Sequence, residues 1–141
     1  MHQDWHELLF LHWEMRVEDL RPLIPEPLEI DTFDGKAWLT VTPLTITNLR
    51  PPYFPAIPYL SWLYELNVRT YVYLDGVPGV WFFSLDCNSS AAVMAARTFY
   101  HLPYYDALID MEQTGQTIDY ALKRTDDPPA RFRGARPSLR W

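Results

Sequence analysis

The sequence predicts an α+β fold: a mainly antiparallel, curved sheet that approaches a partly closed barrel, with one substantial helix at about residues 89–100. Residues 62–86 hold two aromatic and β-branched runs around Asp75-Gly76-Val77-Pro78-Gly79, which is typical of a β-hairpin. A second Asp-Gly pair at 34–35 joins two more extended runs. The segment at about residues 89–100 begins with residues that commonly cap helices. Strands therefore dominate the expected fold.

The first third of the chain reads as strands around a short helical stretch. Residues 8–16 predict a strand, although periodicity alone also permits a short helix. Residues 17–24 predict one or two helical turns that the following prolines end. Residues 28–33 and 36–46 then predict two strands. Pro43 favours an edge position or a bulge in the second one, because proline lacks a backbone N–H.

Residues 48–58, NLRPPYFPAIP, predict a stiff, extended loop because of their four prolines. Two roles remain open for this loop. It either caps the core as a rigid connection, which we favour, or covers a cavity as a lid with Arg50 at its hinge.

The second half of the chain reads as a helix followed by strands. Asn88, Ser89 or Ser90 can cap the helix, and Leu102-Pro103 ends it. The remaining segments are a strand at 107–112, a turn at Gly115, an alternating strand at 116–124 and a loop at 125–141.

Composition limits the classes of function. A chain of 141 residues with 48% hydrophobic content forms one domain with a sizeable core. The net charge of −6 argues against a general nucleic-acid binder. We also expect no membrane span, no signal peptide, no zinc site, no cofactor and a cytoplasmic location, with Cys87 as an inert buried thiol.

The hairpin carries an alternating polar face. Glu65, Asn67 and Arg69 point to one side of the first strand. A four-residue loop would place Ser84 and Asp86 opposite them, whereas a five-residue loop would turn Asp86 toward the apolar face, where an unpaired carboxylate is costly. We therefore favour the four-residue loop. The face is then either a solvated surface or the wall of a cavity.

Three further side chains have two readings each. Arg97 lies on the predicted helix, where it is either an ordinary surface residue or a buried partner of Asp86 or Glu65. His12 and His101 are single histidines without metal-ligand spacing, which makes core positions more common than roles as bases or ligands.

Five segments in this order resemble the YqjF-like uncharacterised family, which is grouped with the acetoacetate-decarboxylase-like superfamily. They are LLFLHWEM, LRPLIPEPLEIDTFDGKAW, ELNVRTYV, GVWFFSLD and RTFYHLPYY, and the resemblance covers nearly all of residues 5–125. It implies a curved, partly closed antiparallel fold around an internal cavity, with oligomers common among the decarboxylases. The YqjF-like family itself has no assigned activity.

The resemblance also bears on chemistry. The decarboxylases use a Schiff-base lysine in a motif of an arginine, a short helical stretch and Gly-x-Pro-Lys-Lys. Here Arg97 and the proline match, but Tyr104 and Tyr105 stand where the two lysines would be. The chain has two lysines, Lys36 in a predicted turn and Lys123 near the tail. Schiff-base decarboxylation is therefore not expected.

The leading hypothesis is a single domain, residues 1–141, that binds a small carboxylate or carbonyl compound in an internal cavity and lacks the C-terminal part expected of the family. The alternatives are a lyase acting on a β-keto acid and a structural or oligomerisation module; we also expect a homo-oligomer. The predicted ligand-binding residues are Glu65, Asn67, Arg69, Ser84, Asp86, Arg97, Tyr104 and Tyr105.

Overall fold

The computed structural model describes residues 2–50, 53, 62–115 and 117–137. Strands make up most of it. The elements are β1 (His2–His6), β2 (Leu11–Met15), α1 (Val17–Leu20), the 3-10 helix η1 (Arg21–Leu23), β3 (Glu29–Ile30), β4 (Ala37–Arg50), β5 (Trp62–Leu74), β6 (Val77–Cys87), α2 (Ser90–Tyr100), β7 (Tyr104–Thr114), β8 (Thr117–Arg124) and β9 (Arg131–Pro137).

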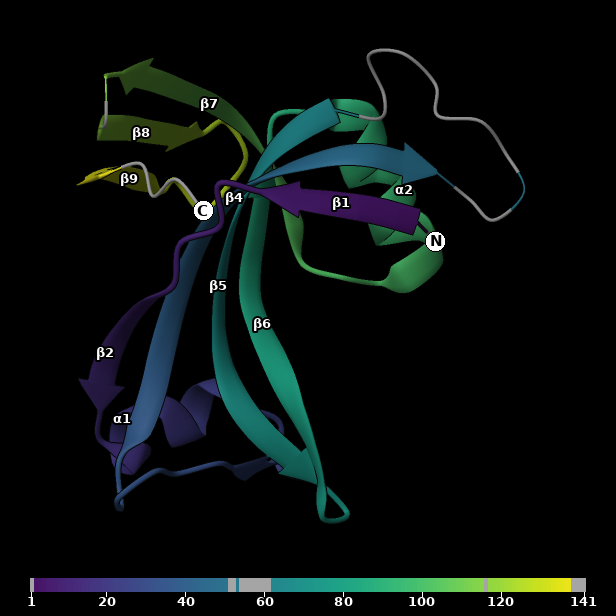
Figure 1. The fold of residues 1–141 in the computed structure, drawn as a ribbon. Coiled ribbons are helices and arrows are strands. Elements are labelled where there is room, and N and C mark those ends of the chain that lie inside the picture. Colours follow the sequence, from purple (N-terminus) through teal and green to yellow (C-terminus); the bar gives the residue numbers. More distant parts are fainter. Residues whose placement is uncertain (1, 51–52, 54–61, 116, 138–141) are drawn as a thin grey trace.

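Three long antiparallel strands, β4, β5 and β6, form the centre of one curved sheet (Figure 1). The strand order is β1-β4-β5-β6-β7-β8-β9, while β2 also pairs with β4 and β3 with β5. Helix α2 connects β6 to β7, and these two strands are parallel. Among the described residues β1 and β9 do not pair with each other. The predicted α+β class with a curved, mainly antiparallel sheet is confirmed, and within the described residues this sheet does not close into a barrel.

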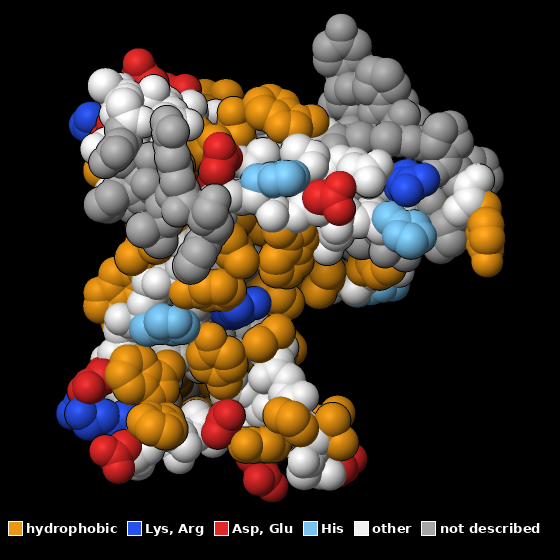
Figure 2. Space-filling model, viewed as in Figure 1, with side chains coloured by type: hydrophobic (Ala, Val, Ile, Leu, Met, Phe, Trp, Pro, Cys, Tyr) orange, Lys and Arg blue, Asp and Glu red, His pale blue; other side chains and the backbone are white. Residues whose placement is uncertain are grey.

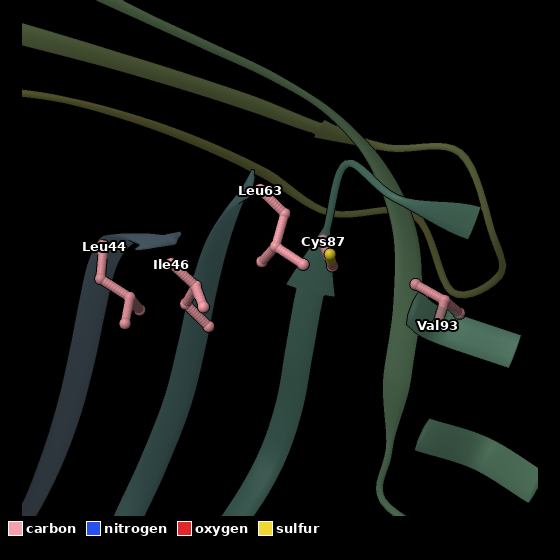
Figure 3. Packing of buried hydrophobic residues seen from close by; sticks show 5 residues of the cluster. All are labelled: Leu44, Ile46, Leu63, Cys87 and Val93. Carbon is pink, nitrogen blue, oxygen red and sulfur yellow. The ribbon is translucent and has the colours of Figure 1, made fainter. Parts of the chain in front are cut away.

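Different elements cover the two faces of the central strands. On one face a buried cluster joins the strands to α2. It consists of Leu44, Ile46, Leu63 and Cys87 from the strands and Val93 from α2, as Figure 3 shows. The opposite face carries two other clusters. One lies under β7 and β8 and contains Leu66, Ala107, Tyr120 and Leu122; the other lies under α1 and contains Leu20, Ile24, Ala37 and Val72.

Several local predictions are confirmed. Residues 17–23 form the predicted helical turns. Helix α2 begins after Ser89, whose hydroxyl accepts a hydrogen bond from the backbone N–H of Ala92. Asp34 and Gly35 have φ values of 57° and 75°, as a type I′ turn requires. Each of these features depends on residues close in sequence.

Pro43 does not mark an edge strand, because β4 lies between β5 and the pair β1 and β2. Strand β1 pairs with β4 at residues 45–50, and β2 pairs with it at 37–41, so Pro43 lies in the break between them. Its carbonyl accepts a hydrogen bond from the Leu9 N–H on that side. The absent N–H of proline therefore faces a place where no ladder partner is needed.

Two other predictions have different outcomes. The loop expected at 125–141 is wrong for its middle part, since Arg131–Pro137 forms β9 and pairs with β8. The proline-rich loop or lid lies outside the described residues, apart from Tyr53 and the end of β4. No helix within the described residues has the length and apolar character needed to cross a membrane.

Candidate functional site

The central hairpin has a tighter turn than expected, and a bulge then changes its register. Leu74 pairs with Val77 across the two-residue turn Asp75-Gly76, so the predicted four-residue loop is wrong. An irregularity between Val68 and Arg69 shifts the pairing by one residue. Beyond that bulge Glu65 lies opposite Cys87 instead of Asp86. A one-residue shift moves every later side chain to the other face of the sheet.

The bulge divides the predicted polar surface between two faces. Glu65, Asn67 and Arg69 remain on the face toward α2, opposite Leu44, Thr42 and Thr40 of β4, respectively. Ser84 and Asp86 lie on the other face, with Leu66 and Val68. The expectation of one surface carrying all five residues is therefore wrong.

A pocket of about 170 Å³ lies between α2 and the strands β4 and β5. Its walls are mainly apolar, and the small side chains of α2 leave room for it. The lining residues are Gln3, Ile46, Leu49, Leu63, Glu65, Ala92, Ala95, Ala96, Tyr100, Leu102 and Tyr104. Two of the predicted site residues, Glu65 and Tyr104, thus meet in one pocket, which we call the α2 pocket.

Glu65 is a buried carboxyl group without a cationic partner among the described residues. Its exposed fraction is 5%, and the Tyr104 hydroxyl donates a 2.7 Å hydrogen bond to its Oε2. Burial raises the pKa of Glu65, and hydrogen bonding by the side chains of Tyr104 and Asn67 opposes that rise. Burial and the nearby Glu65 also raise the pKa of Tyr104. The pair therefore favours neutral, hydrogen-bonding forms.

Asp86 is equally well buried, with an exposed fraction of 1%, but it has a full partner. Arg124 of β8 donates from Nε to Oδ1 at 2.5 Å and from Nη2 to Oδ2 at 2.8 Å. Ser84 Oγ adds a 3.3 Å hydrogen bond, and the Arg124 guanidinium lies 3.9 Å from the ring centroid of Tyr105. Asp86, Ser84 and Tyr105 therefore belong to an ion-pair cluster that joins β6, β7 and β8.

Arg124 is the residue that sequence reasoning missed. It explains why Asp86 tolerates the apolar face, since the assumed unpaired carboxylate is in fact paired there. A signal for it exists in the alternation of β8. Ile118, Tyr120, Leu122 and Arg124 share the buried face, and an arginine in such a series requires an acidic partner.

Arg97 lies at the exposed end of α2 and does not line the α2 pocket. Its guanidinium pairs with Asp126 and donates to the backbone carbonyl of Tyr104 at 2.7 Å. The surface reading is therefore right, and pairing with Glu65 or Asp86 is wrong. The two tyrosines also differ, because Tyr104 reaches the pocket while Tyr105 lies against Arg97 and Arg124.

Comparison with known protein families shows which family this chain belongs to. The DUF2071 family, described as an uncharacterised conserved protein, matches residues 2–140. The chain belongs to this family. The uncharacterised protein YqjF of Bacillus subtilis (strain 168) is 48% identical over 135 residues, which are 96% of this chain and 56% of YqjF. The chain thus spans about half the length of this DUF2071 relative.

Solved structures show the same fold at low sequence identity. Acetoacetate decarboxylase from Legionella pneumophila superposes with a TM-score of 0.63 at 15% identity, covering 82% of this chain and 42% of the decarboxylase. A second acetoacetate decarboxylase structure gives 0.65 at 16%, with coverages of 85% and 43%. The enduracididine biosynthesis enzyme MppR, in complex with pyruvate, gives 0.60 at 14%, with coverages of 84% and 51%. The fold of this DUF2071 chain is therefore acetoacetate-decarboxylase-like.

Neither lysine of this DUF2071 chain lines the α2 pocket. Lys36 pairs with Glu14 at 2.6 Å, and Lys123 lies on the exposed face of β8. Within the described ranges no three or more His, Cys, Asp or Glu side chains group as metal ligands would. The polar side chains that line the pocket are thus the Glu65 carboxyl group, the Tyr100 and Tyr104 phenols and the Gln3 amide.

Proposed function

We propose that the chain binds a small carbonyl compound in the α2 pocket, where the protonated Glu65 carboxyl group, held by the Tyr104 hydroxyl, donates a hydrogen bond to the carbonyl oxygen. The observation that carries this proposal is the buried Glu65–Tyr104 pair, which opens into an otherwise apolar pocket. A typical small-molecule site is an apolar cavity that contains a small number of polar groups.

The charge state of the pair selects the kind of ligand. A carboxyl group with a raised pKa retains its proton at higher pH and can donate a hydrogen bond. None of the described residues that line the pocket is a lysine or an arginine, so none of them offsets the charge of a carboxylate placed beside Glu65. A neutral carbonyl group fits better. The volume of about 170 Å³ restricts the occupant to a few non-hydrogen atoms, because drug-sized ligands need roughly 300–1,000 Å³.

The names of the structural neighbours agree with this ligand class. Two are acetoacetate decarboxylases and a third is bound to pyruvate. Acetoacetate and pyruvate are both small oxo compounds. The lysine-free pocket supports binding without imine formation, because an imine requires an amine. We therefore propose carbonyl binding and not Schiff-base decarboxylation.

Titration with pentan-2-one, followed by NMR, tests the proposal. We expect shifts at pocket residues. We also expect Tyr104→Phe to weaken the affinity by about 2- to 12-fold, because it removes the hydrogen bond that holds the Glu65 carboxyl group in place. Tyr105→Phe is the matched control, because its ring lies outside the pocket. Absence of shifts at the pocket, or equal losses in the two variants, would contradict the proposal.

A further inference from the structure

The face that carries the α2 pocket continues beyond the helix. Further along β4 and β5, Thr42 pairs with Asn67 and Thr40 pairs with Arg69. This part of the face borders a second hollow of about 340 Å³, lined by His12, Asp31, Phe33, Trp38 and Tyr71. Figure 2 shows a concave surface below the part of the molecule that carries β1 and α2. Hydrophobic side chains line this surface. Arg69 lies between the α2 pocket and this second hollow.

Polar atoms along this stretch are buried without hydrogen-bond partners in the described part of the chain. They are Thr42 Oγ1, Asn67 Oδ1 and Arg69 Nε. Thr42 and Asn67 are themselves buried residues, with exposed fractions of 1% and 3%. Leaving such groups unpaired costs free energy, and native proteins rarely do so without a reason. Arg69 is the one of these three residues that is only half-buried, so its guanidinium is the group that a ligand can reach.

Of these groups, the Arg69 guanidinium is the one that can bind a charged ligand most strongly. Its guanidinium lies 5.3 Å from the ring centroid of Phe10 and 6.0 Å from that of Tyr71. Neither a carboxylate nor a hydrogen-bond acceptor pairs with this half-buried guanidinium among the described residues, whereas the buried Asp86 and Arg124 pair with each other. Asp31 lines the second hollow but does not form an ion pair with Arg69. An arginine oriented by two rings presents a fixed fork that suits a carboxylate.

The geometry points to one ligand with two ends: we propose that Arg69 binds the carboxylate of the compound whose carbonyl group lies in the α2 pocket. This inference rests on the proposed function. Glu65 and Arg69 are four residues apart on one strand face, which is about 13 Å. A compound whose ketone and carboxylate flank a single methylene is too short to reach both. The ligand class is therefore an oxo acid whose methyl ketone and carboxylate are separated by several methylenes.

Calorimetric titration with a homologous series tests this inference. The probes are acetoacetate, 5-oxohexanoate and 7-oxooctanoate, with pentan-2-one as the neutral reference. We expect the longer acids to bind at least about tenfold more tightly than acetoacetate, as a charged hydrogen-bond pair allows. Arg69→Met should remove that gain and leave pentan-2-one binding unchanged, while Arg69→Lys should restore part of it. Arg97→Met is the matched control, because Arg97 pairs with Asp126 outside the pocket.

The outcomes separate the inference from the function beneath it. If pentan-2-one binds in a Tyr104-dependent manner but the acids gain nothing, the inference is wrong and the proposed function stands. If the acids bind through Arg69 without dependence on Tyr104, the two-ended ligand is wrong and so is the carbonyl site. If no probe binds to a folded protein, both fail. Circular dichroism of each variant verifies that the chain remains folded.

Discussion

Two buried carboxyl groups lie on opposite faces of the same central strands, and their surroundings differ. Asp86 has a bidentate arginine partner and a hydroxyl, whereas Glu65 has a phenol and a pocket. Burying a charge is tolerated in proteins either when an opposite charge pairs with it or when the group becomes neutral. The protein uses the first solution at Asp86, whereas the raised pKa of Glu65 favours the second solution there. A structural carboxylate and a candidate ligand-binding acid are thereby distinguished by their partners rather than by their burial.

The largest expected effect comes from breaking the ion pair on the structural face. Arg124→Met leaves the Asp86 carboxylate buried without its cation, which should lower the free energy of unfolding by about 3–5 kcal/mol. Glu65→Gln, the matched variant on the other face, replaces a neutral acid with a neutral amide and should cost only about 1 kcal/mol or less. Urea denaturation measures both values. Equal losses would break the distinction between the two carboxyl groups.

The smallest expected effect is at the exposed arginine. Arg97→Met removes a solvent-screened pair with Asp126, so the urea midpoint should remain close to that of the wild type. The same variant should not change ligand affinity, since Arg97 does not line the α2 pocket. A large loss of pentan-2-one binding in Arg97→Met would place this residue in the ligand-binding site, where the sequence predicts it.

Sequence reasoning found the features that depend on nearby residues. The cap at Ser89, the Asp34-Gly35 turn and the helix that Leu102-Pro103 follows all formed where their local patterns predict. The alternation of Glu65, Asn67 and Arg69 also placed these three residues on one face. Together with the resemblance to the decarboxylase-like superfamily, these patterns were sufficient for the fold class and for naming Glu65 and Tyr104 as residues that line one pocket.

The missed features depend on contacts between distant parts of the chain. The bulge at Val68 and Arg69 reverses the faces of Ser84 and Asp86, and no local residue pattern requires it. Arg124 reaches Asp86 from 38 residues away. Strand β9 forms in a proline- and arginine-rich segment because β8 offers it an edge. The homo-oligomer stays a prediction.

The protonation state of Glu65 is the basis of the proposed function. A raised folded-state pKa means that the folded protein retains a proton that the unfolded chain releases. The contribution of Glu65 to stability is therefore fully present below the ordinary pKa of 4.5 and is lost as pH rises through the folded-state value. Relative to Glu65→Gln, the wild-type protein should lose stability across that interval.

The most direct measurement is the titration of the Glu65 side-chain carboxyl carbon by NMR, assigned by comparison with Glu65→Gln. We predict a midpoint above 4.5, together with a parallel fall in wild-type stability relative to the variant. A midpoint at or below 4.5, or pentan-2-one binding that persists at pH values well above the measured midpoint, would contradict a neutral Glu65 that donates to a carbonyl ligand.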